Sequence, residues 1–459
     1  MVKRFGLGLL VLLATGCANE TADDRENATP ADEGEEPAAP PAPPPPPLDN
    51  GKRPRPAPLP IPKMASYEML CKLINDQRLD DTTPNGNHLR ANLMGTDLGI
   101  PVAHDDHVFL FFGDTMGYKG IWRVGESLPD AVGYAPLAEL TKDPRALCSQ
   151  MRFLRLPPNA SIGPKVDARI EADFAPAAMT APQGRALGEF IRNPSGNGKF
   201  PQLPGDFEVP SGAFSHDGSI YVFYTTVNSS SDVEMKASYL ARWKKPDPAG
   251  VPTYEILYPV DQRFDAGGTL GGNFINVAAE TFGPWVYLFG TGQYRESPVY
   301  LARKLLATLD KPGGFERFDP KKQIWVPQGT SVDPLVADSY NGEMSIRHYP
   351  QVGRWMMINQ QGTPTHNRVV ARFAERPQGP WSDAVIVHDM DDRKFTDKHC
   401  CSETSCGPQQ LFHCNKAAFY GTYLFPFVSG DRDAFTVTYT MSTWDPYNVA
   451  LMQSTFTAR

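Results

Sequence analysis

The sequence has no excess of basic residues and no hydrophobic run long enough to span a membrane. Its 459 residues include 44 Lys and Arg against 52 Asp and Glu, which gives a formal net charge of -8. A nucleic-acid-binding protein needs a basic surface to contact phosphates, so this balance argues against nucleic acid as a partner. The apolar stretch Phe5–Leu13 is too short to cross a bilayer as a mature helix, and no other stretch is long and apolar enough.

Several catalytic signatures are also missing. The sequence contains no sialidase-type Asp box, no glycine-rich loop that would cradle a phosphate, no His-Glu-x-x-His and no Gly-x-Ser-x-Gly. None of the chemistries that these motifs mark is therefore indicated. Long helical patterns are scarce as well, and a period of two dominates, which favours β-strands.

Residues 1–17 have the pattern of a bacterial export signal. Lys3 and Arg4 supply positive charge, Phe5–Leu13 forms the apolar region, and small residues lead to Cys17. Small residues directly before a cysteine resemble a lipobox, in which Cys17 would be lipidated and become the mature N-terminus. We therefore predict an exported lipoprotein of the bacterial cell envelope, periplasmic or at the cell surface, with a membrane anchor at Cys17. The alternative is an ordinary signal peptide that is cleaved nearby.

Residues 18–63 have the composition of a spacer. They are rich in Pro, Ala, Glu and Asp and include the proline-rich run 40–47. Such a segment cannot form a hydrophobic core, and closely spaced prolines favour an extended, semi-rigid conformation. We predict a disordered Pro-rich linker that holds the following domain away from a membrane, with the folded domain at residues 64–459.

Six cysteines remain when Cys17 is set aside, and four of them lie close together between residues 400 and 414. An even number of cysteines in an exported protein favours disulfides. A metal site is the alternative, because His399 and His413 stand next to cysteines in this segment, but no standard zinc spacing is matched. The sequence alone does not determine which cysteines pair.

An apolar and aromatic strand pattern recurs five times in residues 64–459. The last four copies are spaced by about 65 residues, and an insertion around residues 157–204 would explain the longer first interval. The copies begin at Val108, Ile220, Trp285, Trp355 and Phe419. Each repeat is long enough for a four-stranded sheet, which predicts an all-β, five-bladed β-propeller. A β-sandwich, the alternative, would not require so regular a long period.

The segment Gly95–Thr115 has the pattern of a β-hairpin with an aspartate on each strand. If residues 105–106 form the turn, Asp97 on one strand faces Asp114 on the other. Residues that face each other across strands have Cβ atoms about 4.5–5.5 Å apart, where like charges destabilise the sheet. Two carboxylates held together in this way indicate a shared proton or cation. A bulge at Gly113 would shift the pairing by one residue, and a capping role for each aspartate is the alternative.

Equivalent positions in the other repeats are also polar. The inner strands of a propeller surround one channel, so residues at equivalent positions converge at one mouth of that channel. Counting back from each hairpin turn predicts a ring that consists of Asp97, Asp114, Glu208, Asn273, Glu343, Gln360 and Gln409. Arg295 and Arg347 follow or neighbour these positions. A propeller rim in contact with solvent would be polar too, so each member of the ring also has a structural interpretation.

Carboxylates on opposite sides of a cleft are suited to glycoside hydrolysis. One carboxylic acid protonates the leaving oxygen, while a second carboxylate acts as base or nucleophile. Asp97 and Asp114 are the predicted catalytic pair, with Glu343 as a further acid or a substrate ligand. The predicted substrate-binding residues are Asn273, Arg295, Arg347 and Gln360. This chemistry requires no cofactor, and a structural Ca²⁺ held by the same carboxylates is compatible with it.

Several motifs together resemble one known family. They occur in the order Gly95-Thr-Asp-Leu-Gly, Phe112-Gly-Asp-Thr, Gly290-Thr-Gly-Gln-Tyr-Arg, Asn341-Gly-Glu-Met-Ser, Gly379-Pro-Trp-Ser and Thr440-Met-Ser-Thr-Trp-Asp-Pro-Tyr-Asn. This set is similar to domain-of-unknown-function family 4185 over most of residues 90–456. The resemblance implies a five-bladed propeller related to glycoside hydrolase family 183, endo-D-arabinanases that cut the D-arabinan of mycobacterial-type cell walls. It also implies that Asp97 and Asp114 are the catalytic pair.

The sequence therefore predicts a surface-anchored glycoside hydrolase that acts on a polysaccharide, with an arabinan-like polymer as the implied substrate. The alternative is a non-catalytic carbohydrate-binding or scaffold propeller on the cell surface. The two hypotheses differ in whether products are released, and in whether substitution of Asp97 and Asp114 has any effect.

Overall fold

The computed structural model describes residues 59–75, 93–117, 130–154, 207–228, 233–248, 254–263, 268–363, 366–402, 405–416 and 418–458. These residues belong to one compact unit, Pro58–Arg459. The predicted signal peptide, Cys17 and nearly all of the predicted linker lie outside the described residues. No helix in the described part of the chain is long and apolar enough to cross a membrane.

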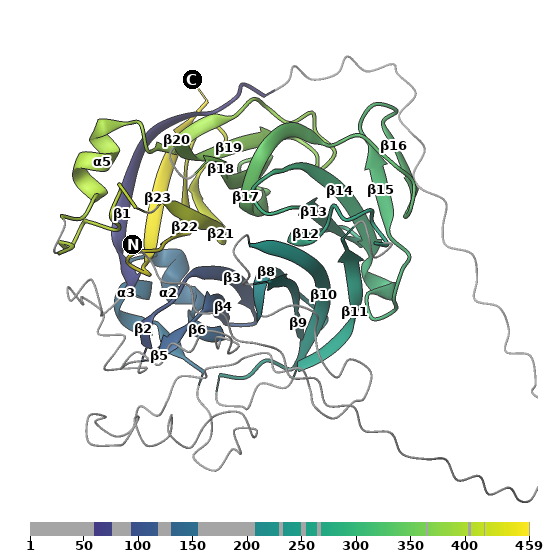
Figure 1. The fold of residues 1–459 in the computed structure, drawn as a ribbon, viewed down its shortest axis with the longest axis horizontal. Helices are drawn as coiled ribbons and strands as arrows, with labels where there is room; N and C mark the ends of the chain where they lie inside the picture. Colours follow the sequence, from purple (N-terminus) through teal and green to yellow (C-terminus); the bar gives the residue numbers. More distant parts are fainter. Residues whose placement is uncertain are drawn as a thin grey trace, which may run out of the picture. The chain divides into compact units, whose positions relative to one another are not determined.

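Antiparallel strands that follow one another along the chain form the successive blades of a propeller (Figure 1). The first blade contains β3 (Leu98–His104), β4 (His107–Asp114), β6 (Asp130–Pro136) and β7 (Arg152–Phe153). The second contains β8 (Phe207–His216), β9 (Ser219–Asn228), β10 (Glu234–Lys244) and β11 (Tyr254–Gln262). The third contains β12 (Asn276–Phe282), β13 (Trp285–Thr291) and β14 (Ser297–Leu305), with β15 (Glu316–Asp319) and β16 (Ile324–Pro327) at its outer edge.

The last two blades complete the ring. The fourth contains β17 (Val336–Tyr349), β18 (Arg354–Thr363), β19 (His366–Ala374) and β20 (Val385–Asp389). The fifth contains β21 (Phe419–Gly430), β22 (Ala434–Thr443), β23 (Val449–Thr457) and the N-terminal strand β1 (Lys63–Ile74). The innermost strands β3, β8, β12, β17 and β21 contact one another in cyclic order. The described strands therefore form the closed, five-bladed, mostly β architecture that the repeats predict.

The core consists of the five interfaces between consecutive blades. Five hydrophobic clusters among the described residues each combine strands of neighbouring blades, and the cluster between the first two blades also includes Tyr420 and Tyr423 of the fifth. Between the first two blades, for example, Phe109 packs edge-on against Trp243 with ring centroids 5.2 Å apart. Because both faces of a blade are covered, the β4 run Val108–Phe112 is buried on both sides. This explains why the recurring sequence pattern is a continuous apolar run.

The fifth blade differs from the others in the position of its patterned strand. In the first four blades this strand is the second from the channel, as in β4, β9, β13 and β18. In the fifth blade it is β21, the innermost strand, because β1 supplies the outer edge from the other end of the described chain. The prediction of a further inner strand before Phe419 is therefore wrong, and Gln409 lies in a loop.

The short elements lie at the edges of the blades. β2 (Leu93–Gly95) pairs with β5 (Met116–Gly117), and α2 (Leu137–Lys142) and α3 (Ala146–Gln150) connect β6 to β7. A 3-10 turn, Leu306–Thr308, follows β14, and α5 (Arg393–His399) follows β20.

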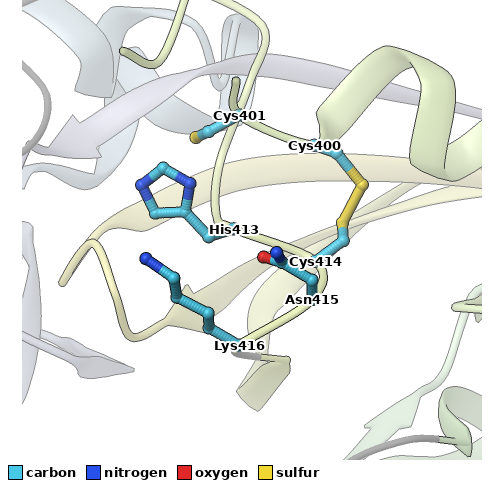
Figure 2. Close-up of a pocket in the computed structure, with 6 residues that line it drawn as sticks. All are labelled: Cys400, Cys401, His413, Cys414, Asn415 and Lys416. Atoms are coloured by element: carbon cyan, nitrogen blue, oxygen red, sulfur yellow. A yellow bond between two sulfur atoms is a disulfide. The ribbon is translucent and has the colours of Figure 1, made fainter. Parts of the chain in front are cut away.

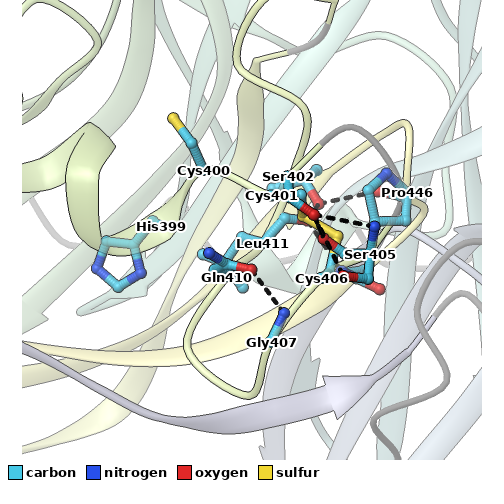
Figure 3. The surroundings of a disulfide bond; sticks show 12 residues. His399, Cys400, Cys401, Ser402, Ser405, Cys406, Gly407, Gln410, Leu411 and Pro446 are labelled. Carbon is cyan, nitrogen blue, oxygen red and sulfur yellow. Dashed lines mark hydrogen bonds between the residues drawn. A yellow bond between two sulfur atoms is a disulfide. The ribbon is translucent and has the colours of Figure 1, made fainter.

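Three disulfides lie within the described residues. They are Cys71–Cys148, Cys400–Cys414 and Cys401–Cys406, the last of which is shown in Figure 3. The predicted disulfides are thus confirmed, and the alternative of a metal site at these cysteines is excluded because every sulfur is in a disulfide. Such bonds form and persist in oxidising compartments, which indicates an extracellular or periplasmic protein.

Candidate active site

The β3–β4 hairpin places its two aspartates together, although not in the predicted register. His104 pairs with His107 and the pairing continues to Ile100 and Phe111, but Leu98 then pairs with Phe112. The amide of Gly113 accordingly donates to the carbonyl of Asp97 at 3.1 Å. The predicted pairing of Asp97 with Asp114 is wrong by one residue, because the left-handed backbone at Gly99 (φ +88°) accommodates an extra residue in β3.

Five carboxylates gather where the inner strands begin. Asp97 immediately precedes β3, Asp114 ends β4, and Asp130 begins β6 as the cross-strand partner of Asp114. Glu208 is the second residue of β8 in the next blade, and Glu343 lies in β17. The Asp97 carboxylate is close enough to Asp114 and Glu343 for both to repel it, and the charges of Asp97, Asp114 and Glu208 act on Asp130.

Burial and mutual repulsion favour the protonated form of four of these carboxyls. Burial, with the charge of Asp114 as the next cause, raises the pKa of Asp97 well above its usual value. Burial, followed by the charge of Glu208, also raises the pKa of Asp130 well above its usual value. The pKa of Asp114 is raised by burial to about 6, and burial followed by the charge of Asp114 raises that of Glu208 to about 7. Protons are therefore available here near neutral pH.

The cluster contains more hydrogen-bonding atoms than the described residues satisfy. One carboxylate oxygen of each of Asp97, Asp114 and Asp130 is buried and has no hydrogen-bond partner among them. The Gln360 amide oxygen and the Tyr423 hydroxyl are also buried and have no hydrogen-bond partner among the described residues. Buried polar atoms in folded proteins are normally paired, so a convergent group of unpaired ones indicates a place for water or a polar ligand.

Tyrosine hydroxyls from the fifth blade contact the catalytic candidates. Tyr420 Oη donates to Asp97 Oδ2 at 2.8 Å. Tyr447, in the loop between β22 and β23, makes a hydrogen bond with Asp114 and another with Tyr420. These bonds fix the orientation of the two carboxylates. Neither tyrosine was predicted, since the register of the fifth blade differs from that of the others.

An ion pair holds the fourth-blade carboxylate. Arg295 Nη2 lies 3.1 Å from Glu343 Oε1, and Glu343 is only 6% exposed. The guanidinium group lies over the rings of Tyr294 and Tyr420, 4.4 and 5.0 Å from their centroids. Cation–π contact and ion pairing together fix this arginine beside the carboxylate cluster. The structure thus brings the predicted residues Arg295 and Glu343 together.

Two glycines allow the close packing of this site. A Cβ on Gly113 would lie 2.5 Å from Asp97 Oδ1, and one on Gly342 would clash with the Gln360 amide oxygen. Gln360 lies opposite Gly342 and Glu343 at a bulge between β17 and β18, which places the predicted Gln360 next to Glu343. A side chain at either glycine would displace a functional group.

Strained backbone also occurs in the same segments. Four non-glycine residues have positive φ angles of 54–66° in the loops and strand ends around the cluster: Leu98, Arg295, Tyr340 and Asp445. The left-handed region is unfavourable for residues with a Cβ, and such strain accumulates at functional sites. The other described non-glycine residues with positive φ, Asp105, Asp217, Lys245 and Gln323, lie in turns away from the cluster.

Two further predicted residues have other partners. The Asn273 amide donates to the carbonyl of Leu270 at 3.4 Å, within its own loop. Arg347 lies four residues beyond Glu343 on β17, about 13 Å further along the channel. It donates to Glu280 Oε2 at 2.8 Å and to the carbonyls of Leu424 and Pro101. Its guanidinium group therefore joins the inner strands of four blades.

The described residues contain no group of three or more His, Cys, Asp or Glu side chains arranged to hold a metal ion. A structural Ca²⁺ therefore stays a prediction that melting experiments with a chelator can test.

The disulfide-bonded segment supports the loop that carries Tyr447. The Leu411 carbonyl accepts hydrogen bonds from Thr443 Oγ1 at 3.1 Å and from Asn448 Nδ2 at 2.9 Å. The amide of His413 donates to the carbonyl of Asp445 at 3.1 Å. Beside these contacts, a cavity of about 490 Å³ is lined by residues 400, 401 and 413–416 (Figure 2). The two local disulfides therefore restrain one wall of the candidate active site.

The fold and site define an exported propeller with a carboxylate-rich centre. The family model "Domain of unknown function (DUF4185)" matches residues 168–453, more than half of the chain. The chain therefore belongs to this family, as its motifs predict. The matched region includes Arg295, Glu343 and Gln360 and begins after Asp97 and Asp114.

Solved structures with similar folds include an α-L-arabinanase and an α-L-arabinofuranosidase. The α-L-arabinanase of Cellvibrio cellulosa in complex with arabinohexaose is 11% identical, with a TM-score of 0.40, and the match covers 78% of this chain and 91% of that one. The α-L-arabinofuranosidase of Podospora anserina is 10% identical, with a TM-score of 0.42 and coverage of 87% and 97%. These similarities are too distant to assign an activity to this chain.

One curated protein matches a part of the sequence. Notoamide biosynthesis cluster protein J' of Aspergillus versicolor is 24% identical over 152 residues. The match spans 33% of this chain and only 35% of that relative.

Proposed function

We propose that this protein is an exported glycoside hydrolase that acts on a polysaccharide through the carboxylate cluster at the mouth of its central channel. The observation that supports this most is the group of buried carboxylates with raised pKa values, three of which carry an oxygen that no described residue hydrogen-bonds. Glycoside hydrolysis needs one carboxyl that is protonated near neutral pH and a second that is ionised.

Asp97 and Asp114 are the proposed reacting pair. Asp97 is the proposed acid, because burial and the charge of Asp114 raise its pKa well above the usual value; it would donate its proton to the glycosidic oxygen as the bond to the anomeric carbon breaks. Asp114, with a pKa of about 6, is mainly ionised at pH 7. As base it would take a proton from the attacking water; as nucleophile it would itself attack the anomeric carbon.

The surroundings of the pair suit a sugar. Arg295 and the Gln360 amide offer hydrogen bonds to hydroxyl groups. Glu343, which is neutralised by Arg295, is the proposed substrate ligand beside the pair. We further propose an arabinan-like polymer as substrate, on the basis of the sequence motifs, and anchoring to the cell envelope through a lipid at Cys17.

The test is product release from a panel of polysaccharides that includes arabinan and arabinogalactan. We expect wild type to release sugars and Asp97→Asn and Asp114→Asn each to abolish release. Asp106→Asn is the matched control, because this aspartate is exposed at the far end of the same hairpin and should not affect release. If wild type binds a polymer without cleaving any, the protein is a carbohydrate-binding propeller. Full activity in both site variants would exclude the assignment of the pair.

A further inference from the structure

Two large aromatic side chains are exposed beside the buried cluster. Tyr340 is 53% exposed and precedes Glu343 by three residues, and Trp444 is 49% exposed and precedes Tyr447 by three residues. Three residues of chain span at most about 11 Å, so both Cα atoms lie within that distance of a residue of the site. Tyr340 belongs to the fourth blade and Trp444 to the fifth, so the two come from neighbouring blades.

The segment that exposes Tyr340 is firmly attached to the fold. Asn341, which is fully buried, donates from its amide to the carbonyl of Ser297 at 3.0 Å and accepts from Asn359 at 3.1 Å. Asp338 forms an ion pair with the buried Arg372. With its neighbours held in this way, Tyr340 adopts a positive φ of 66° and projects from the strand.

The segment that exposes Trp444 is attached just as firmly. Thr443 and Asn448, both fully buried, hydrogen-bond to the carbonyl of Leu411 in the disulfide-bonded segment. Asp445, with a positive φ of 54°, accepts a hydrogen bond from the amide of His413. An exposed tryptophan on a strained and anchored turn is held in place before any ligand arrives.

We propose that Tyr340 and Trp444 are stacking platforms for a saccharide chain that extends from the carboxylate cluster over the fourth and fifth blades. This inference rests on the proposed function and deepens it, because it says which residues bind the polysaccharide beyond the reacting sugar. An aromatic ring offers a flat apolar face to the C–H face of a sugar, while the Tyr hydroxyl and the Trp N–H remain free to meet water or hydroxyl groups. Rigid anchoring limits the entropy lost on binding.

The experiment measures polymer binding separately from cleavage. Asp97→Asn, which should not cleave, serves as the background, and its retardation in gels that contain arabinogalactan or arabinan gives a dissociation constant. Adding Trp444→Ala or Tyr340→Ala is expected to weaken binding about tenfold, the effect of losing one aromatic contact. Trp444→Phe should recover most of the loss, because it retains a ring.

Phe282→Ala in the same background is the matched control. Phe282 is also exposed, at 46%, but it ends β12 and so lies at the other mouth of the channel. Its loss should leave binding unchanged. Equal binding by the background protein and both aromatic variants would overturn the platforms while cleavage by wild type still supported the proposed hydrolase. Failure of wild type to bind or cleave any polymer would overturn both.

Discussion

Both ends of the central channel contain arginine and carboxylate side chains. Within the described residues, the hydrogen bonding of these groups is complete at one end and incomplete at the other. Further along the channel, Arg347 is matched by Glu280 and by two main-chain carbonyls from other blades. At the mouth, Arg295 compensates Glu343, while Asp97, Asp114 and Asp130 each have a buried oxygen without a hydrogen-bond partner among the described residues. A buried charge whose neighbours complete its bonding joins the blades. A cluster whose bonding is incomplete is available for a ligand or a reaction.

The largest expected difference between the two ends is in the consequence of removing one charge. Asp97→Asn should lower the rate of polysaccharide hydrolysis about 10²–10⁴-fold, the usual contribution of a general acid, without lowering stability. Glu280→Gln should keep the rate but reduce the free energy of unfolding by about 3–5 kcal/mol, because Arg347 loses its buried partner. Denaturant unfolding and initial rates of both variants test this. If the two substitutions changed the hydrolysis rate equally and the free energy of unfolding equally, the two ends of the channel would not differ in role.

The buried carboxylates at the mouth of the channel should also make the free energy of unfolding depend on pH. The pKa values of Asp114 and Glu208 are raised from 3.8 and 4.5 to about 6 and about 7. The folded state therefore binds more protons than the unfolded state between about pH 4 and pH 7, and the free energy of unfolding should fall as pH rises through this window. Each pKa unit corresponds to about 1.4 kcal/mol.

Melting curves of wild type from pH 4.5 to 8 would show this decrease. Glu208→Gln should flatten it, whereas the exposed control Asp106→Asn should retain the wild-type slope. A stability that rises with pH over this range would show that the carboxylates are not protonated in the folded state.

A smaller effect is expected from the contacts that orient the pair. Tyr447→Phe removes a hydrogen bond that favours ionised Asp114, so the pKa of Asp114 should rise and kcat should fall about tenfold at pH 6–7. Replacement of Cys401 and Cys406 by Ser should also raise the pKa of Asp114 and lower kcat. The reason is that this disulfide restrains the segment that hydrogen-bonds to the Tyr447 loop.

The Cys71–Cys148 disulfide is the matched control for the Cys401–Cys406 disulfide. Its replacement by Ser should lower the melting temperature and leave the pH dependence of kcat as in wild type, because it joins β1 to α3 away from the cluster. A shift of the pH profile in this control but not in the Cys401–Cys406 variant would contradict the positioning role.

The smallest expected effect is that of a chelator. If the predicted structural Ca²⁺ is bound, EDTA should lower the melting temperature slightly and added Ca²⁺ should reverse the decrease, because the ion stabilises the folded state. An unchanged melting temperature would count against a cation at the carboxylate end of the channel.

The sequence predicted the five repeated blades and part of the site because both depend on local patterns. Asp97 and Asp114 are linked by a short hairpin, and Glu343 is found by counting from another turn. Tyr420 could not be found in this way, since the fifth blade is completed by a strand from the other end of the described chain. The role of Arg347 could not be predicted either, because its partners Glu280, Pro101 and Leu424 are distant in sequence.

Asp130 shows a further limit of such counting. It begins the third strand of the first blade, and its proximity to Asp114 follows from cross-strand pairing across an interval of unrelated sequence. No periodic pattern marks it, although an aspartate directly before an apolar strand, as in Asp130-Ala-Val, is a weak signal that could have been considered.

The closure of the ring has a mechanical consequence. β1 pairs with β23 from Lys63↔Thr457 to Ile74↔Val449, and Cys71 ties it covalently to α3 beside the first blade. If the chain is tethered through the residues that precede β1, a pulling force would enter the domain along the length of this ladder. The force would then act parallel to β1, so the hydrogen bonds between β1 and β23 would bear it together. The Cys71–Cys148 disulfide would keep β1 from sliding past β23 beyond Cys71. The blade that completes the propeller is thus also the part best suited to withstand drag on a tethered domain.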